Sequence, residues 1–478
     1  MSGAGVSGGE GASGGQGAAF VAELLDEGSF TALAGAPAAP GPGVQGPGVL
    51  AGFGTVEGRE VCVLAHTGPG AGGPLAAAAV RAELRVRAVA ARTGRPVVTV
   101  HDATGPGTPQ GFGELVRSAA ALSGVVPQVA VVVGAADAER ALLLPLADVV
   151  VATAPARSTL ADPGALAAAH GPHAPGDAGG AALHAGATGR FARVEPDAAA
   201  AAGFVRELLA HLPSNNLATP PRWELDGELD GGPDAELDGG PDSELEGLLP
   251  PDPTAPYDVR DVLARLVDDG ELLELHEEHA PNVVTAFARV DGRSTGVLAP
   301  QPAVLAGALD AAACAKAARF VRFCDAFGVP VLTAVDTAGF APAAEDAPGD
   351  PTASAAQLLY AYAEASVPLI TVVTGRAHGP AATALGSRHV GADVVLAWPR
   401  ARLGPREAVA AVAAEHGREP GAAAEHGQDA HAAWLRRLAE QDELAAPGAA
   451  VAAGDVDAVL APGRTRAHLV RALRLLER

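Results

Sequence analysis

The stretch that decides the fold reads Phe53-Gly54-Thr55-Val56-Glu57-Gly58-Arg59, and it returns as Phe287-Ala288-Arg289-Val290-Asp291-Gly292-Arg293. The same spacing of 234 residues relates 94–99 to 328–333 and Asp102 to Asp336. Further along, Gly134 corresponds to Gly375 at a spacing of 241, and 147–150 to 392–395 at 245. Chance similarity between alanine-rich segments does not hold one register over so many steps. The chain therefore contains two copies of one unit.

Each copy alternates short apolar runs with helical segments. The predicted strands are 61–65, 96–100 and 127–133 in the first copy and 296–298, 330–335 and 369–374 in the second. The predicted helices are 75–92, 113–122 and 140–146, then 311–327, 355–365 and 381–390. Near-continuous valine runs separated by helices predict buried parallel strands, and hence an α/β fold.

Two biased segments mark the limits of the copies. Residues 1–19 are almost entirely Gly, Ser and Ala, and we expect them to be disordered because they cannot bury enough surface. Residues 222–256 form an acidic Gly/Pro segment, with ten carboxylates and no base between 224 and 246, which predicts a solvated linker. The expected domains are therefore 20–221 and 257–478.

Composition excludes several classes of function. The net charge of −23 argues against nucleic acid or an anionic membrane as the main partner. The single lysine, Lys316, lies in no Walker A loop, so the chain is not a P-loop NTPase. Cys62, Cys314 and Cys324 have no metal-binding or disulfide spacing, which suits a reducing cytoplasm. No apolar run predicts a transmembrane helix or a signal peptide.

Two short motifs imitate known sites. Residues 68–73 match G-x-G-x-x-G, but Pro69 removes one peptide N–H, and the second copy has no glycines there, so a Gly-rich turn is the better interpretation. His276 and His279 lie three residues apart, whereas the metalloprotease motif needs four. We interpret these histidines, and those at 170, 173, 416 and 426, as solvated, and predict no metal site.

Longer stretches carry a family resemblance. They are 211–216 (His-Leu-Pro-Ser-Asn-Asn), 316–327, 336–340 (Asp-Thr-Ala-Gly-Phe), 359–365 and 391–399, with 24–30 and 454–457 in support. Together they resemble the carboxyltransferase (β) subunit of biotin-dependent acyl-CoA carboxylases of the propionyl-/acetyl-CoA type, from about residue 20 to the C-terminus.

The resemblance implies a fold, an assembly and partners. The fold would be two duplicated crotonase-like (ClpP/crotonase spiral) domains, with the first copy on the acyl-CoA side and the second on the biotin side. The assembly would be an oligomer, a hexamer in the family, acting in the cytoplasm in fatty acid metabolism. No cofactor would be bound covalently, because biotin is carried by a partner biotin carboxylase/biotin carrier subunit.

The resemblance also places a Gly-Gly-Ala turn in each copy, where peptide N–H groups at a helix start meet a developing oxyanion. In the first copy, counted from Gly134, this turn is Ala138, Glu139 and Arg140. Two charged side chains would then lie where the acyl thioester belongs, and the carboxylate of Glu139 would repel the enolate.

In the second copy the turn, counted from Gly375, is Gly379, Pro380 and Ala381, and Thr383 stands where the family has an acyl-selecting Asp. Proline has no N–H to donate, and losing one oxyanion donor costs about 10²–10³ in rate. Pro380 suits the first turn of a helix, however, so we expect that helix to persist.

These departures leave two functions open. One is a carboxyltransferase β subunit that moves a carboxyl group from carboxybiotin to an acyl-CoA. The alternative is a catalytically impaired homologue that serves as a binding or structural subunit of a carboxylase complex. Another crotonase-type reaction, such as decarboxylation, is a third possibility. Whether the chain is an active enzyme is left open by the sequence.

Overall fold

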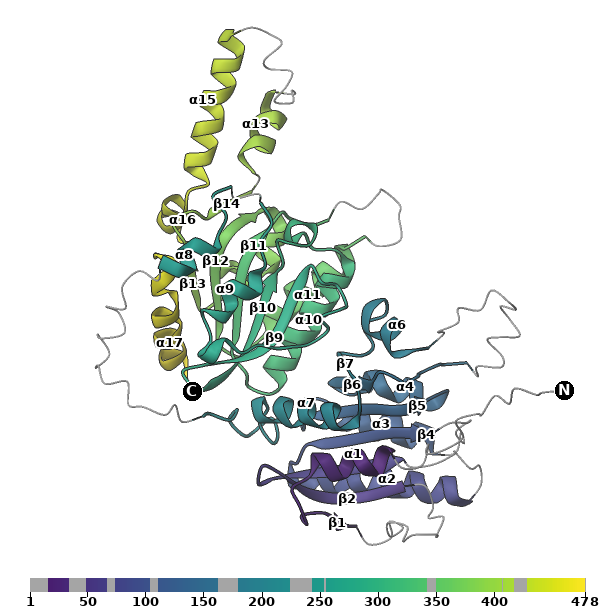
Figure 1. Cartoon of the computed structure of the whole chain (residues 1–478). Helices are drawn as coiled ribbons and strands as arrows, with labels where there is room; N and C mark the ends of the chain where they lie inside the picture. The colour runs from purple at the N-terminus through teal and green to yellow at the C-terminus, as the bar shows by residue number, and fades with distance from the viewer. Residues whose placement is uncertain are drawn as a thin grey trace, which may run out of the picture. The chain divides into compact units, whose positions relative to one another are not determined.

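The computed structural model describes residues 16–33, 49–66, 74–103, 111–161, 179–223, 243–252, 255–341, 350–405, 407–416 and 428–477. The chain divides into two compact units, 1–218 and 219–478, each with its own sheet (Figure 1). Among the described residues, none of the helices is both long and apolar enough to cross a bilayer.

The sheet of the first unit follows chain order from β1 to β7. Its strands are β1 (Thr31–Ala32), β2 (Val49–Val56), β3 (Arg59–His66), β4 (Val97–Ala103), β5 (Gln128–Ala136), β6 (Val149–Thr153) and β7 (Arg193–Glu195). The first three pair antiparallel, and β3 to β7 pair parallel. Every residue of β6 is buried, as expected for a strand covered on both faces.

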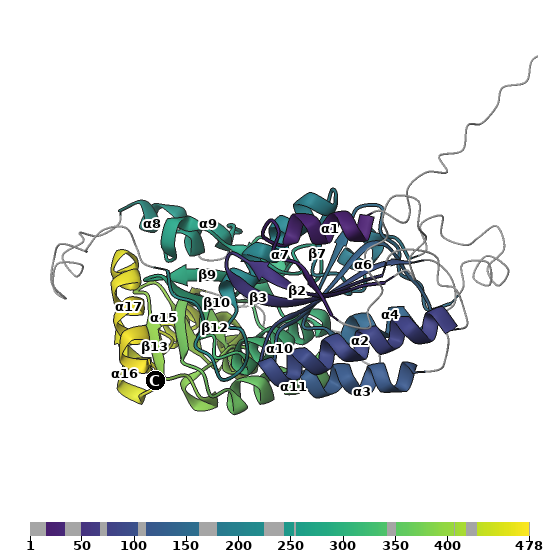
Figure 2. The ribbon, with the colours of Figure 1, turned by 90° about the horizontal axis from the view of Figure 1, so that it is seen from below.

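Helices cover this sheet. They are α1 (Gln16–Leu24), α2 (Pro74–Thr93), α3 (Phe112–Leu122), α4 (Glu139–Leu143), α6 (Ala181–Gly186) and α7 (Ala198–His211). Helices α2 and α3 run side by side (Figure 2), and α1 packs against α7. Few aromatic residues contribute to the core, which is built mostly from Val, Leu and Ala.

The second unit repeats this sheet. Its strands are β8 (Leu273–Glu274), β9 (Val283–Val290), β10 (Arg293–Pro300), β11 (Val331–Thr337), β12 (Leu369–His378), β13 (Val394–Ala397), β14 (Arg402–Gly404) and β15 (Ala458–Val459). Strands β9, β10 and β11 begin and end 234 residues after β2, β3 and β4. Strand directions also agree, antiparallel up to β10 and parallel from there on. The duplicated α/β fold is confirmed.

The helices of the second unit are α8 (Ser243–Leu248), α9 (Val259–Ala264), α10 (Ala311–Ala326), α11 (Thr352–Glu364), α12 (Gly379–Ala384), α13 (Ala408–His416), α15 (Gln428–Leu444), α16 (Pro447–Ala453) and α17 (Thr465–Leu476). Helices α10 and α11 pack together as α2 and α3 do. Helices α13 and α15 form a hairpin that projects beyond β14 (Figure 1). Val412, Trp434 and Leu438 make its small core.

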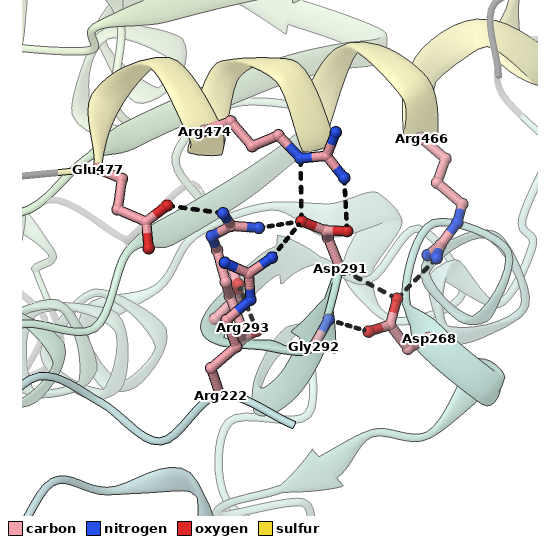
Figure 3. A network of polar contacts seen from close by, with 9 residues as sticks. Arg222, Asp268, Asp291, Gly292, Arg293, Arg466, Arg474 and Glu477 are labelled. Atoms are coloured by element: carbon pink, nitrogen blue, oxygen red, sulfur yellow. Dashed lines mark hydrogen bonds and ion pairs between the residues drawn. The ribbon is translucent and has the colours of Figure 1, made fainter. Parts of the chain in front are cut away.

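The repeated stretch, 53–59 and 287–293, forms the turn of an antiparallel hairpin in each unit. Both turn residues of the second hairpin, Asp291 and Gly292, have positive φ (56° and 70°). Asp268 accepts hydrogen bonds from both of their N–H groups (Figure 3). Arg466 and Arg474 of α17 pair with Asp268 and Asp291, which ties the C-terminal helix to the turn.

The first hairpin is held in the same way. Asp26 accepts from the N–H groups of Glu57 and Gly58, and Arg206 of α7 pairs with it. Asp26 and Asp268 are thus equivalent, because each carboxylate accepts hydrogen bonds from both N–H groups of its hairpin turn. The matching segments 24–29 and 266–271 are a further repeat that the sequence comparison did not use.

Three sequence expectations need correction. The helix predicted over 381–390 ends at Ala384, because Gly386 adopts φ +72° and a Cβ there would lie 2.8 Å from the Tyr362 ring. Helix α1 begins at Gln16, inside the segment expected to be disordered, because Phe20, Val21 and Leu24 are buried. The end of the expected linker also folds. Helix α8 covers 243–248, since Leu245 joins the second core, while 224–242 lie outside the described residues.

Candidate active site

An aspartate and a glycine face each other in both sheets, next to the candidate turns. Asp102 and Asp336 lie at register shifts between β4 and β5 and between β11 and β12. A Cβ on Gly134 would lie 2.3 Å from Asp102 Oδ1, and one on Gly375 would lie 2.4 Å from Asp336 Oδ2. Any side chain at the glycine would displace the carboxylate. Gly134 and Gly375 themselves lie within β5 and β12, because the bulge needs space opposite the aspartate.

In the second copy the turn follows β12 directly. His378 is the N-cap residue of α12, Gly379 has φ +63°, and Pro380 occupies the first turn. The expectation that the helix persists with Pro380 in that position is confirmed. Ala381 is fully buried, and Thr383 follows within α12. The turn keeps its shape but has lost the N–H of residue 380.

A cavity of roughly 790 Å³ lies within the second unit and reaches His378, the N-cap residue of α12. Its polar wall comes from β12 and β14 and their surroundings, with Arg376, His378, Arg400, Arg402 and Glu407. Its apolar wall comes from the α13–α15 hairpin, with Val409, Leu435 and Leu438. A ligand with a polar head and an aliphatic stem matches such a pair of walls.

Asp336 organises the polar wall. The backbone N–H and Nε of Arg376 donate to its Oδ1 at 3.1 and 2.9 Å, and the Tyr257 hydroxyl donates to Oδ2 at 3.0 Å. Burial, and after it the Asp336 charge, raise the pKa of Tyr257, so its hydroxyl stays protonated and remains a donor. The guanidinium of Arg376 also donates to the Ala306 carbonyl at 3.1 Å. Arg376 is therefore held in one position at the cavity edge.

The imidazole of His378 is not held by hydrogen bonds on all sides. Its Nδ1 is buried and has no hydrogen-bond partner among the described residues. Burial is the main reason that the pKa of His378 lies below the ordinary histidine value, and the charges of Arg376 and Arg402 act in the same direction. We therefore treat the ring as neutral near pH 7.

In the first copy the equivalent turn is strained. Ala138 is the N-cap residue of α4 and has φ +54°, a value that residues other than glycine rarely adopt. Its N–H donates to the Thr159 carbonyl at 2.8 Å, while the preceding Asp137 accepts from the N–H and hydroxyl of Thr159. Hydrogen bonds with Thr159 thus hold Ala138 at the positive φ that suits the glycine implied there by the family resemblance.

Arg140 points into a buried polar cluster. Its guanidinium donates to His66 Nε2 at 2.7 Å and lies 3.9 Å from Glu83, which also pairs with Arg87. Burial, together with the Arg140 charge, lowers the pKa of His66 to about 4, so the ring is neutral and Nε2 accepts. The His101 ring stacks on His66 at 5.8 Å. The charge of Arg140 is thus directed toward Glu83.

The structure brings the predicted residues together in two groups, Gly134, Ala138, Glu139 and Arg140 at the end of β5, and Gly375, Gly379, Pro380, Ala381 and Thr383 at the end of β12. Sequence reasoning missed Arg376, His378, Arg402 and Tyr257, and the side chains of His66 and Glu83 that contact Arg140. The repeat spacing of 241 could have pointed to His378, because it aligns this residue with Asp137.

The structure also locates some of the histidine motifs singled out in the sequence. The carbonyls of His276, His279, Ala280 and Val283 accept hydrogen bonds from Lys316, and in the described part of the chain no cluster of three metal-ligating side chains occurs. The segment 68–73 and the histidines at 170, 173 and 426 lie outside the described residues, as does the side chain of His416.

Comparisons with known proteins agree on one family. The model of the carboxyl transferase domain matches residues 21–478. The propionyl-CoA carboxylase beta chain of Saccharopolyspora erythraea is 39% identical and aligns with 95% of this chain and 86% of its own length. The methylmalonyl-CoA carboxyltransferase 12S subunit of Propionibacterium freudenreichii is 34% identical, over 90% and 81%. A crystal structure of transcarboxylase 12S, described as a hexamer assembly with hydrolysed methylmalonyl-coenzyme A bound, superposes with a TM-score of 0.85 at 32% identity, over 96% and 89%.

Proposed function

The chain belongs to the carboxyl transferase domain family, and from this premise we propose that it passes a carboxyl group between biotin on a partner subunit and an acyl-CoA. The observation that carries the proposal is the repeated Asp–Gly bulge, Asp102–Gly134 and Asp336–Gly375. It presents a turn and a helix start at the carboxyl end of the parallel strands in both units, where α/β proteins bind ligands.

The second unit suits biotin. Its cavity joins a polar wall with Arg376 and His378 to an apolar wall with Leu435 and Leu438, which fits a polar ring on an aliphatic stem. Biotin carried by the partner would supply the carboxyl group there. The buried turn residue Ala381 would direct its N–H toward the ring oxygen, and Asp336 would keep Arg376 in place.

The first unit would take the acyl-CoA at the Ala138 turn. The backbone there has the positive φ that a donor turn requires. Because Arg140 is paired with His66 and Glu83, its charge is satisfied within the unit. Glu139 has a buried, unpartnered Oε2, so we still expect it to weaken binding of a developing anion.

The alternative of a catalytically impaired subunit rests on Pro380, Glu139 and Arg140. The comparisons do not favour it, because the two relatives compared above are named a carboxylase beta chain and a carboxyltransferase subunit. The helix after Pro380 is also intact.

By the same family argument we propose a hexamer as the working assembly. A stable monomer at micromolar concentration in light scattering would contradict it. The three buried free thiols, Cys62, Cys314 and Cys324, support a cytoplasmic setting.

The test is a reconstituted assay. The purified chain is combined with a biotin carboxylase, a biotin-bearing carrier, ATP and labelled bicarbonate, and a panel of acyl-CoAs is offered. We expect acid-stable label on at least one acyl-CoA. A chain that assembles with its partner but labels none of the panel would contradict the proposal. A matched control omits the carrier, which must abolish labelling.

A further inference from the structure

Equivalent positions at the ends of β5 and β12 are used differently. Asp137 precedes the first turn, and its carboxylate is occupied by the N–H and hydroxyl of Thr159 at 3.1 and 2.8 Å. By the repeat spacings, His378 occupies the place of Asp137, and Gly404 the place of Thr159. Gly404 has no side chain, so the partner that holds residue 137 does not exist for His378.

The imidazole of His378 is consequently available to bind a ligand. Its Nδ1 is buried and without a hydrogen-bond partner among the described residues, while the His378 side chain is part of the cavity lining. A proton on Nδ1 would be a buried, unpaired donor, which is costly. The neutral ring therefore carries its proton on Nε2, the nitrogen that can meet a molecule in the cavity.

A donor is missing close by. Pro380 lies two residues after His378, in the first turn of α12, and provides no peptide N–H. We propose that the His378 Nε2–H replaces this missing peptide donor and binds the carbonyl oxygen of a cyclic urea, the biotin ring, in the cavity. The inference rests on the proposed function, since the ligand class comes from it. The orphaned ring nitrogen and the missing N–H are features of this chain itself.

A neutral imidazole suits the role. It donates a hydrogen bond without adding a fourth positive charge to a wall that already holds Arg376, Arg400 and Arg402. Asp336 pairs with Arg376 and Asp442 with Arg402, and Glu407 lies on the same wall. A polar but uncharged acceptor, such as a ureido oxygen, is therefore the better match to the cavity than a strong anion.

Side-chain geometry gives the discriminating variants. His378→Phe keeps the ring size and removes the donor. His378→Gln places an amide N–H near the position of Nε2, whereas His378→Asn places one near Nδ1. His389, which is exposed and paired with Asp455, gives the control His389→Gln.

Binding is measured first, with biocytin as the probe and the full-length chain in isothermal titration. We expect His378→Phe to weaken biocytin binding about 10-fold or more, His378→Gln to restore most of the affinity, and His378→Asn to restore little. Histidine ¹⁵N NMR should show Nε2 protonated, with its proton signal shifted by biocytin. Equal affinity for wild type and His378→Phe would overturn the inference, and so would an Nδ1-protonated ring.

Turnover in the reconstituted assay then tests the replacement. His378→Phe should lower kcat by about 10²-fold, whereas the control His389→Gln should leave it unchanged. In the double variant of His378→Phe with Pro380→Gly the restored peptide N–H should recover most of the loss, a far larger gain than Pro380→Gly gives in the wild type, so the two changes should be strongly non-additive. Additive effects would exclude replacement. If the wild type turns over and His378→Phe matches it, the inference fails and the proposed function stands. If the wild type neither binds biocytin nor transfers a carboxyl group, both fail.

Discussion

Asp102 and Asp336 occupy equivalent bulges, yet the two copies hold them by different means. Asp336 is paired with Arg376 and Tyr257. Asp102 receives N–H groups from Gln16 and Gly17, the first residues of α1, and has no arginine in the place of Arg376, where the first copy has Ala135. Burial accordingly raises the pKa of Asp102 to about 6. A duplicated backbone can thus keep one geometry while its electrostatics diverge.

The largest expected effect is at Asp336. Replacing it in Asp336→Asn leaves the guanidinium of Arg376 largely buried without its counter-charge, so we expect unfolding free energy to fall by about 3–5 kcal/mol. Urea denaturation of the two proteins measures the difference. The matched variant Asp102→Asn should not destabilise at pH 7. Equal losses at both sites would show that the two aspartates are held in the same way.

Lys316 comes next, because the first copy has Ala82 in its place. Its buried ammonium donates to four carbonyls of the 276–283 segment, at 2.6 to 3.4 Å. Lys316→Met should cost about 3 kcal/mol, since those carbonyls would lose their donor. Arg322→Met, at an exposed position of the same helix, is the thermal-shift control and should change stability by less than about 0.5 kcal/mol. A variant as stable as wild type would exclude this anchoring role.

The pH dependence of Asp102 is smaller. Its pKa is higher in the folded than in the unfolded chain, so the folded state binds the proton more tightly. The stability from this group is present below pH 4 and is lost as pH rises toward 6. After allowance for solvent screening we expect a loss of about 1–2 kcal/mol. Asp102→Asn should remove this slope, which denaturation at pH 4, 5, 6 and 7 measures. An identical pH profile for the variant would contradict the assignment.

The smallest expected effect concerns one backbone angle in both turns. Ala138 and Gly379 are equivalent by the 241 spacing, with φ of +54° and +63°. Ala138→Gly should stabilise the chain by about 1 kcal/mol, because glycine adopts this region without strain. Gly379→Ala should destabilise it by a similar amount, since its Cβ would also lie 3.3 Å from the Pro405 carbonyl. Chemical denaturation measures both. Changes of the same sign would mean that the turns are not equivalent.

Sequence alone was sufficient for the architecture. The repeat of 53–59 at 287–293 and its constant spacing identified the duplication, because each copy must bury the same pattern of apolar strands. The family also came from local motifs, and the positions of both turns came from counting along the chain from Gly134 and Gly375, as the resemblance implies. Pro380 in the first turn of α12 followed from the fixed φ of proline alone.

Only the tertiary structure decided what the side chains around those turns do. The sequence predicts the charge of Arg140 in the acyl site, but His66 and Glu83, which lie 74 and 57 positions earlier in the chain, hold it in a buried cluster. Helix α8 formed in an acidic stretch because Leu245 reached the core. The unpartnered imidazole of His378 depends on what Gly404 cannot supply across the sheet. Such contacts join residues far apart in the chain, so the pattern of near neighbours does not contain them.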